Sequence, residues 1–257
     1  MRFDWARFLA AALAALALSS GLAQADQRVS FPAAGGSPAL MGYFAKPKGS
    51  GPFPAVVLLH TCLGLPSNRT MMESALNAFG YAALSVDDFT TRGLKETCSV
   101  DFPQGIADAY GALAWLAGRP DIDRSRVAVL GASQGGDTAL SIATGRAGAP
   151  SGLAFRAAAA FYPPCANQNG AELKMPTLIV VGRADAVTPA ADCEALAERQ
   201  PRGRVTLVVA PGGPHGFDDP AFAGGRRVLG MFLGYDPGAA ATARAQLMAF
   251  LARQLRP

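Results

Sequence analysis

Short apolar runs alternate with longer amphipathic or alanine-rich segments along most of the chain. Six nearly unbroken apolar runs have the pattern of strands buried on both faces of a sheet, at residues 55–59, 81–86, 127–130, 157–162, 177–181 and 205–209. Helix-length segments lie between and after these runs, at residues 67–79, 103–116, 134–144, 190–199 and 240–255. The alternation predicts an α/β fold with a mostly parallel central sheet and helices on both faces. An antiparallel hairpin within residues 28–45 is expected to precede it.

The first 25 residues differ from the rest of the chain. Two arginines precede an apolar run from Leu9 to Leu18, and Ala23-Gln24-Ala25 has the small residues of a signal-peptide cleavage site. A membrane anchor is the alternative, but the run is shorter than the roughly 20 residues that span a bilayer. We therefore expect residues 1–25 to be a cleavable signal peptide and residues 26–257 to form a single secreted or periplasmic domain. After cleavage we expect no stable membrane association, and a monomer or a dimer.

Composition narrows the possible functions. Half of the 257 residues are hydrophobic and 16% are charged, as in globular proteins. A net charge of +4 without a basic run gives no reason to expect a nucleic-acid partner. The four cysteines contain no C-x-x-C pair, and both histidines lie far from any paired cysteines in sequence, so we expect no metal site. Export permits disulfides, but the sequence leaves three connectivities, or buried free thiols, open.

The strongest chemical signal is Gly131-Ala132-Ser133-Gln134-Gly135, which lies between a predicted strand and a predicted helix. This is the G-x-S-x-G pattern of a nucleophilic serine on a sharp turn, where glycines are needed to avoid collisions. The alternative is that Ser133 only caps the helix. A serine hydroxyl is a weak nucleophile and needs a neighbouring base.

The base and the acid follow from chain order, which in this pattern runs serine, acid, histidine. Only His215 of the two histidines follows Ser133 in the chain, and we expect His60 to be structural. Asp185 lies on the loop after a predicted strand, where its carboxylate can orient the imidazole. The rival acids are placed less well, because Glu172 precedes its strand and Asp218 and Asp219 lie too near His215 in the chain.

An oxyanion hole is also expected, made of two backbone N–H groups. One belongs to Gln134, which follows the serine. The other belongs to the loop after the first long strand, at Cys62 or Leu63.

Together these motifs resemble the dienelactone hydrolase family of α/β-hydrolases over roughly residues 40–255. The resemblance rests on the loop at His60, on residues 87–93, on the Ser133 turn, on residues 182–189 and on the Pro-Gly-x-x-His-Gly-Phe segment around His215. It implies hydrolysis without a metal or cofactor.

The chain departs from the family's best-known enzyme in three places. Ser133 stands where that enzyme has a cysteine nucleophile, and Thr61 where it has a glutamate that helps the thiol. Of its two arginines that hold a substrate carboxylate, Arg92 matches the first and Asp219 replaces the second. The resemblance therefore favours an ordinary serine esterase over a dienelactonase. It leaves Arg92 as a candidate substrate-binding residue, the alternative being a structural arginine paired with Asp87 or Asp88.

The strand order usual in this family also bears on the cysteines. It favours the pairs Cys62–Cys98 and Cys165–Cys193, with Cys98–Cys165 as the main rival.

These observations predict an exported serine hydrolase that cleaves a small carboxylic ester or lactone through Ser133, His215 and Asp185. The alternatives are a peptidase or thioesterase with the same triad, or a non-catalytic exported binding protein on this scaffold.

Overall fold

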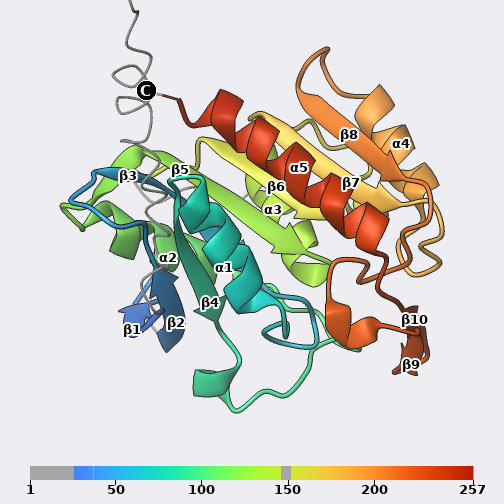
Figure 1. Ribbon diagram of the computed structural model, residues 1–257, viewed down its shortest axis with the longest axis horizontal. Coiled ribbons are helices and arrows are strands. Elements are labelled where there is room, and N and C mark those ends of the chain that lie inside the picture. Colours follow the sequence, from blue (N-terminus) through green and yellow to red (C-terminus); the bar gives the residue numbers. More distant parts are fainter. Residues whose placement is uncertain (1–25, 37, 146–151, 257) are drawn as a thin grey trace, which may run out of the picture.

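The computed structural model describes residues 26–36, 38–145 and 152–256 (Figure 1). The predicted signal peptide, residues 1–25, lies outside the described residues. Within the described ranges, no helix combines the length and apolar character that crossing a membrane would require.

Eight strands form one sheet in the order β1-β2-β4-β3-β5-β6-β7-β8. Their bounds are β1 (Gln27–Pro32), β2 (Ala39–Ala45), β3 (Phe53–Leu59), β4 (Ala82–Asp87), β5 (Ile122–Ala132), β6 (Ala157–Phe161), β7 (Thr177–Gly182) and β8 (Val205–Ala210). The pairings of β1 with β2 and of β2 with β4 are antiparallel, and the other pairings in the sheet are parallel. The predicted fold class is confirmed, and so is the antiparallel entry hairpin.

Helices cover both faces of this sheet. They are α1 (Arg69–Ala78), α2 (Gly105–Ala117), α3 (Gln134–Thr144), α4 (Ala190–Glu198) and α5 (Pro237–Gln254). Helices α1 and α5 lie on one face, towards the viewer in Figure 1, and the other three lie on the opposite face. Alternate strand residues supply the two cores: Val56 packs with the first group of helices and Val57 with the second. Burial on both faces explains why the strands read as unbroken apolar runs.

The predicted chemistry gathers at one edge of the sheet. His60, Ser133 and Asp185 follow the carboxyl ends of β3, β5 and β7, and His215 lies on the loop after β8. The carboxyl ends of parallel strands meet at the same edge, which is where ligands bind in such folds.

A small hairpin that the sequence pattern did not predict follows the His215 loop. It consists of the short helix η4 (Pro220–Phe222) and the antiparallel strands β9 (Arg226–Val228) and β10 (Met231–Leu233). A β-bridge joins Leu233 to His215, and the Gly234 amide donates to the His215 carbonyl over 3.0 Å. The hairpin is thus attached directly to the loop that carries His215.

Two disulfides hold the loops at this edge. They join Cys62 to Cys98 and Cys165 to Cys193, the two pairs that were favoured, so the rival Cys98–Cys165 pairing is wrong. All four cysteines of the chain are thereby paired.

Candidate active site

Ser133 sits on a sharp turn between β5 and α3. Its backbone has φ 51° and ψ −115°, a conformation that non-glycine residues rarely adopt. It occupies the N-cap position of α3, but its side chain makes no capping hydrogen bond. Instead its Oγ lies 2.9 Å from Nε2 of His215. The side chain is therefore directed at the histidine, and the capping alternative does not describe it.

The flanking glycines are required by close packing. A Cβ on Gly131 would overlap the carbonyl oxygen of Gly135 across the turn. A Cβ on Gly135 would lie 2.5 Å from the carbonyl oxygens of Leu59 and His60. The turn can thus form only because both positions lack a side chain, as the motif predicted.

His215 connects Ser133 to Asp185. Its Nδ1 lies 2.8 Å from Oδ2 of Asp185, and the Asp185 side chain is completely buried. A carboxylate can only accept, so Nδ1 carries the proton and Nε2 is left to accept from the Ser133 hydroxyl. The rings of Tyr162 and His215 pack edge to face, with centroids 4.8 Å apart.

Asp185 is held by several donors. Oδ1 accepts from the amides of Val187 and Thr188, each over 2.8 Å, and Oδ2 accepts from the Thr188 hydroxyl over 2.8 Å. Burial alone would raise the pKa of Asp185, but the hydrogen bonds from His215 and Thr188 outweigh it and lower that pKa below its ordinary value. The carboxylate is therefore ionised at neutral pH, as an orienting group for a histidine must be.

The rival acids have other partners. Asp218 accepts from the Tyr162 hydroxyl over 2.7 Å, and burial raises its pKa. Asp219 accepts from the hydroxyl of Ser67 and the amide of Ala221. Glu172 forms an exposed ion pair with Lys174.

His60 directly follows β3 and does not line the cavity beside Ser133. Its Nε2 is 2.7 Å from Oδ1 of Asp88, and its Nδ1 is 2.7 Å from the Thr61 carbonyl oxygen. Burial would lower the pKa of this imidazole, but the Asp88 carboxylate beside it raises the pKa above its ordinary value. These contacts fit the structural role expected for His60.

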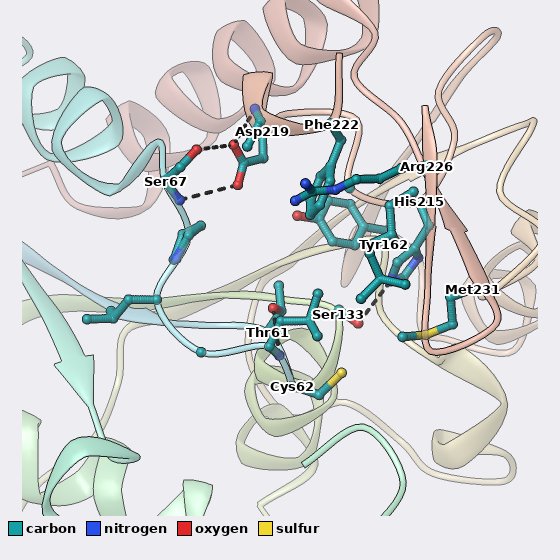
Figure 2. Close-up of a pocket in the computed structure, with 18 residues that line it drawn as sticks. Thr61, Cys62, Ser67, Ser133, Tyr162, His215, Asp219, Phe222, Arg226 and Met231 are labelled. Carbon is teal, nitrogen blue, oxygen red and sulfur yellow. Dashed lines mark hydrogen bonds between the residues drawn. The ribbon is translucent and has the colours of Figure 1, made fainter. Parts of the chain in front are cut away.

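The two predicted oxyanion donors belong to the start of α3 and to the loop after β3. Gln134 is the first residue of α3, and first-turn amides have no partner within a helix. Cys62 lines the cavity beside Ser133 (Figure 2). The Leu63 amide donates to Thr61 Oγ1 over 3.1 Å, which favours Cys62 over Leu63 as the second donor.

A cavity of about 340 Å³ opens above Ser133 and His215. Most of its wall is apolar, with side chains from the loop after β3 and from the hairpin, including Leu63, Leu65, Phe222, Val228 and Met231. Figure 2 shows Ser133 at its base, with the hairpin side chains over one side.

The cavity also has two charged side chains that the sequence did not assign to it as substrate contacts. Asp219 is bonded to Ser67, and Arg226 stacks on Phe222 with its guanidinium carbon 4.9 Å from the ring centroid. Among the described residues, no carboxylate lies within ion-pairing distance of Arg226. The described residues also contain no group of three or more His, Cys, Asp or Glu placed to hold a metal.

Comparison with known proteins identifies the family of this chain. The model of the dienelactone hydrolase family matches residues 40–255, most of the chain. The chain belongs to the dienelactone hydrolase family. Membership makes it a hydrolase that acts on small molecules.

Curated relatives of this dienelactone hydrolase family member include an uncharacterized protein of Mycobacterium tuberculosis, Rv2307c. It is 31% identical over 212 residues, which cover 74% of this chain and 72% of the relative. The esterase FrsA of Klebsiella pneumoniae is 31% identical over 120 residues, covering 45% of this chain and 28% of FrsA.

Solved structures share the fold. The dienelactone hydrolase-like promiscuous phosphotriesterase P91 from metagenomic libraries superposes with a TM-score of 0.70 at 21% identity, covering 91% of this chain and all (100%) of P91. The dienelactone hydrolase of Anabaena variabilis gives a TM-score of 0.66 at 23% identity, with coverage of 91% and 100%.

Arg92, predicted as a substrate contact, is not brought to the cavity of this dienelactone hydrolase family member. Its guanidinium makes a two-pronged ion pair with Asp108 on α2, with both bonds 2.8 Å, and donates to the Asp88 carbonyl over 2.7 Å. The Asp108 side chain is completely buried, and leaving it unpaired would be costly, so Arg92 is committed to it. Arg92 is therefore placed as a structural arginine, which was the alternative prediction. Its carboxylate partner is Asp108 rather than Asp87 or Asp88.

Proposed function

We propose that this protein is an exported serine hydrolase that cleaves a small carboxylic ester or lactone. The observation that supports this most strongly is the hydrogen-bond chain from Ser133 Oγ through His215 to the buried Asp185 at the base of the cavity. A serine, a histidine and an ionised carboxylate in this arrangement form the catalytic triad of acyl-transfer enzymes.

The reaction follows from the atoms at the site. Ser133 Oγ attacks the carbonyl carbon while its proton moves to Nε2 of His215, and the carbonyl π electrons move onto oxygen. The amides of Gln134 and Cys62 stabilise that oxyanion. When the tetrahedral intermediate collapses, Nε2 returns the proton to the departing alkoxide and an acyl-enzyme remains. Water, deprotonated by His215, then attacks the acyl carbon. The acid leaves as the bond to Ser133 Oγ breaks, Nε2 returns its proton to Oγ, and Asp185 stays ionised throughout.

The cavity supports a small and mainly apolar substrate. Its volume of about 340 Å³ lies at the lower end of small-molecule sites, and its wall is mostly apolar. Hydrolysis of the uncharged ester bond needs no charge on the rest of the molecule.

Export is part of the proposal. The pattern of residues 1–25 and the two disulfides both support it, because disulfides form and persist in oxidising compartments outside the cytoplasm. On this proposal the mature protein is a single domain of residues 26–257.

Steady-state hydrolysis of p-nitrophenyl esters with acyl chains from acetyl to octanoyl tests the proposed activity. We expect wild-type turnover, and a loss of about 10⁴-fold or more in kcat for Ser133→Ala. Ser30→Ala, which alters an exposed serine on β1, is the matched control and should keep wild-type rates.

The same assay, extended to thioester and peptide substrates, separates the rival functions. A folded protein that cleaves thioesters or peptides far better than any ester would replace the esterase proposal with the thioesterase or peptidase alternative. A folded protein that cleaves none of them would point to a binding protein.

A further inference from the structure

The loop between β4 and α2 reaches both residues whose amides face the proposed oxyanion. Its segment Thr97-Cys98 lies between Cys62, on the loop after β3, and Gln134, at the start of α3. Thr97 is only 2% exposed. A loop residue this deeply buried calls for a structural explanation, and its contacts supply one.

Two bonds tie this segment to Cys62. Cys98 forms the disulfide with Cys62, and the Thr97 amide donates to the Cys62 carbonyl over 2.8 Å. Both the side chain and the backbone of Cys62 are thereby held. The position of its amide is set from the β4–α2 loop as well as by its own loop.

Two further bonds tie the segment to Gln134. The Thr97 hydroxyl donates to Gln134 Oε1 over 2.7 Å, and Gln134 Nε2 donates to the Thr97 carbonyl over 3.3 Å. The oxygen and the nitrogen of the Gln134 carboxamide are therefore both hydrogen-bonded to Thr97.

The loop between β4 and α2 is itself held by contacts near its start and near its end. Arg92, near its start, pairs with the buried Asp108 on α2, and its guanidinium lies 5.6 Å from the Phe102 ring centroid near the end of the loop. The loop that carries Thr97 and Cys98 is thus attached to α2 through the ion pair of Arg92. This attachment fixes the loop whose Thr97-Cys98 segment contacts the two proposed oxyanion donors.

We propose that Thr97 is a positioning residue that, together with the Cys62–Cys98 disulfide, sets the spacing of the Gln134 and Cys62 amides. The inference rests on the proposed function, because it concerns the same oxyanion. Donors stabilise a developing oxyanion only when they lie within hydrogen-bond range of where it forms, so a small shift in one amide lowers kcat. Substrate binding before the chemical step depends on the cavity wall instead, and KM is expected to change little.

The test compares Thr97→Val, which keeps the shape and removes the hydroxyl, with Thr97→Ser, which keeps the hydroxyl. Two readouts are measured: kcat and KM on a p-nitrophenyl ester, and Ki for an alkyl trifluoromethyl ketone. The ketone carbon bonds to Ser133 Oγ, the serine proton passes to His215, and the ketone oxygen becomes an oxyanion in the same hole. Thr90→Val is a control in the same loop, because the Thr90 hydroxyl donates to Asp87 over 2.7 Å and contacts neither oxyanion donor.

We expect Thr97→Val to lower kcat and to weaken ketone binding by the same factor, about tenfold, with KM within twofold of wild type. Thr97→Ser should restore both, and Thr90→Val should change neither. Unchanged kcat and Ki in Thr97→Val would overturn this inference alone. A wild-type protein that neither cleaves esters nor binds the ketone would overturn the proposed function, and this inference with it.

Gln134→Met gives a second route should Thr97→Val fold poorly. It removes the side-chain carboxamide and keeps the backbone N–H group. It should lower kcat and weaken ketone binding by the same factor as Thr97→Val. The double variant should be no worse than either single one, because both break the same contact. Additive losses would contradict a shared contact.

The two disulfides offer a matched comparison. They close loops of similar sequence separation, 36 and 28 residues, so their removal should cost similar stability. Cys165–Cys193 links η3 (Cys165–Gln168) to α4 and does not bond to Cys62 or Gln134. Cys62→Ala/Cys98→Ala should weaken ketone binding several-fold more than Cys165→Ala/Cys193→Ala. Equal losses in the two double variants would overturn the positioning role of the first bridge.

Discussion

Ser133 is held in a backbone conformation of a kind that costs of order 1–3 kcal/mol. That strain persists because Gly131 and Gly135 let the turn pack directly against β3 and its carboxyl-terminal loop. Gly135 meets the carbonyl oxygens of Leu59 and His60, immediately before the loop that carries Cys62. The same contact therefore fixes the turn that carries the serine hydroxyl and its distance to the loop of the second proposed oxyanion donor.

Thr188 should matter to the reaction although it contacts no substrate. Its hydroxyl lies 2.8 Å from Asp185 Oδ2 and 3.2 Å from His215 Nδ1. Because a hydrogen bond to a charged group contributes about 1.5–3 kcal/mol, we expect Thr188→Val to lower kcat about tenfold or more. Thr188→Ser should restore most of the rate. Steady-state kinetics on one ester provides the measurement, and wild-type kcat in Thr188→Val would show that the two backbone amides hold Asp185 without it.

Ser133, Asp185 and His215 could be predicted because each belongs to a local pattern whose order along the chain is fixed by the fold. Arg92 could not be placed the same way. Its partner Asp108 lies on the following helix, and only the packing of α2 shows that this aspartate faces inward with no other ion-pair partner. Sequence motifs do not identify a buried carboxylate of this kind, because nothing in the sequence around Asp108 indicates that it pairs with an arginine.

At the scale of elements, the hairpin β9–β10 is the part of the site that the sequence pattern did not predict. Its strands have three residues each, too few for an alternating pattern to be recognised, and glycines surround them. Val228, Met231 and Leu233 nonetheless line the cavity, while Leu229 is 58% exposed. The hairpin therefore presents one side to the substrate and the other to solvent.

The hairpin should set the size limit of the substrate. Met231→Trp adds bulk to the cavity wall, so we expect kcat/KM to fall at least tenfold for octanoyl esters and much less for acetyl esters. Leu229→Asn changes the outer side of the same hairpin and suits its left-handed backbone (φ 49°), so it should leave the chain-length profile unchanged. A profile that Met231→Trp does not shift would show that the acyl chain lies elsewhere.

At the scale of the whole molecule, the end of the sheet opposite the active site is held by polar contacts. Asp121 pairs with Lys46, which follows β2, over 2.6 Å, and with Arg119, which follows α2, over 2.9 Å. The Asp121 carbonyl also accepts from the Phe53 amide at the start of β3. One residue thus joins three parts of the chain: the end of β2, the segment after α2 and the start of β3.

These contacts predict how stability depends on acid. Burial alone would raise the pKa of Asp121, but the hydrogen bonds from Arg119 and Lys46 outweigh it and lower that pKa to about 2. Because the carboxyl titrates near 3.9 when unfolded, the stability it contributes is complete above about pH 4 and is lost as the pH falls towards 2. Urea unfolding at pH 7, 4 and 2.5 should show a smaller acid loss for Asp121→Asn than for wild type. Equal losses would mean that Asp121 does not contribute.

The fold as a whole was predictable because the central strands of the sheet are covered on both sides and the helices lie between or after the strands, so local pattern and global architecture agree. The side chains of the cavity wall were not, since they come from loops whose paths depend on the packing of distant segments. Tyr162 and Phe222 lie 60 residues apart in sequence, yet both line the cavity.

The most direct measurement of the central claim is mass spectrometry of the protein after reaction with a fluorophosphonate probe. Ser133 Oγ should displace fluoride from phosphorus, adding one probe per chain at Ser133, with loss of esterase activity in proportion to labelling. Ser133→Ala should not react, and Asp185→Asn should react far more slowly, because an asparagine favours the wrong imidazole tautomer. Labelling at another residue, or a folded wild-type protein that hydrolyses esters without labelling at Ser133, would contradict the assignment of Ser133 as the nucleophile.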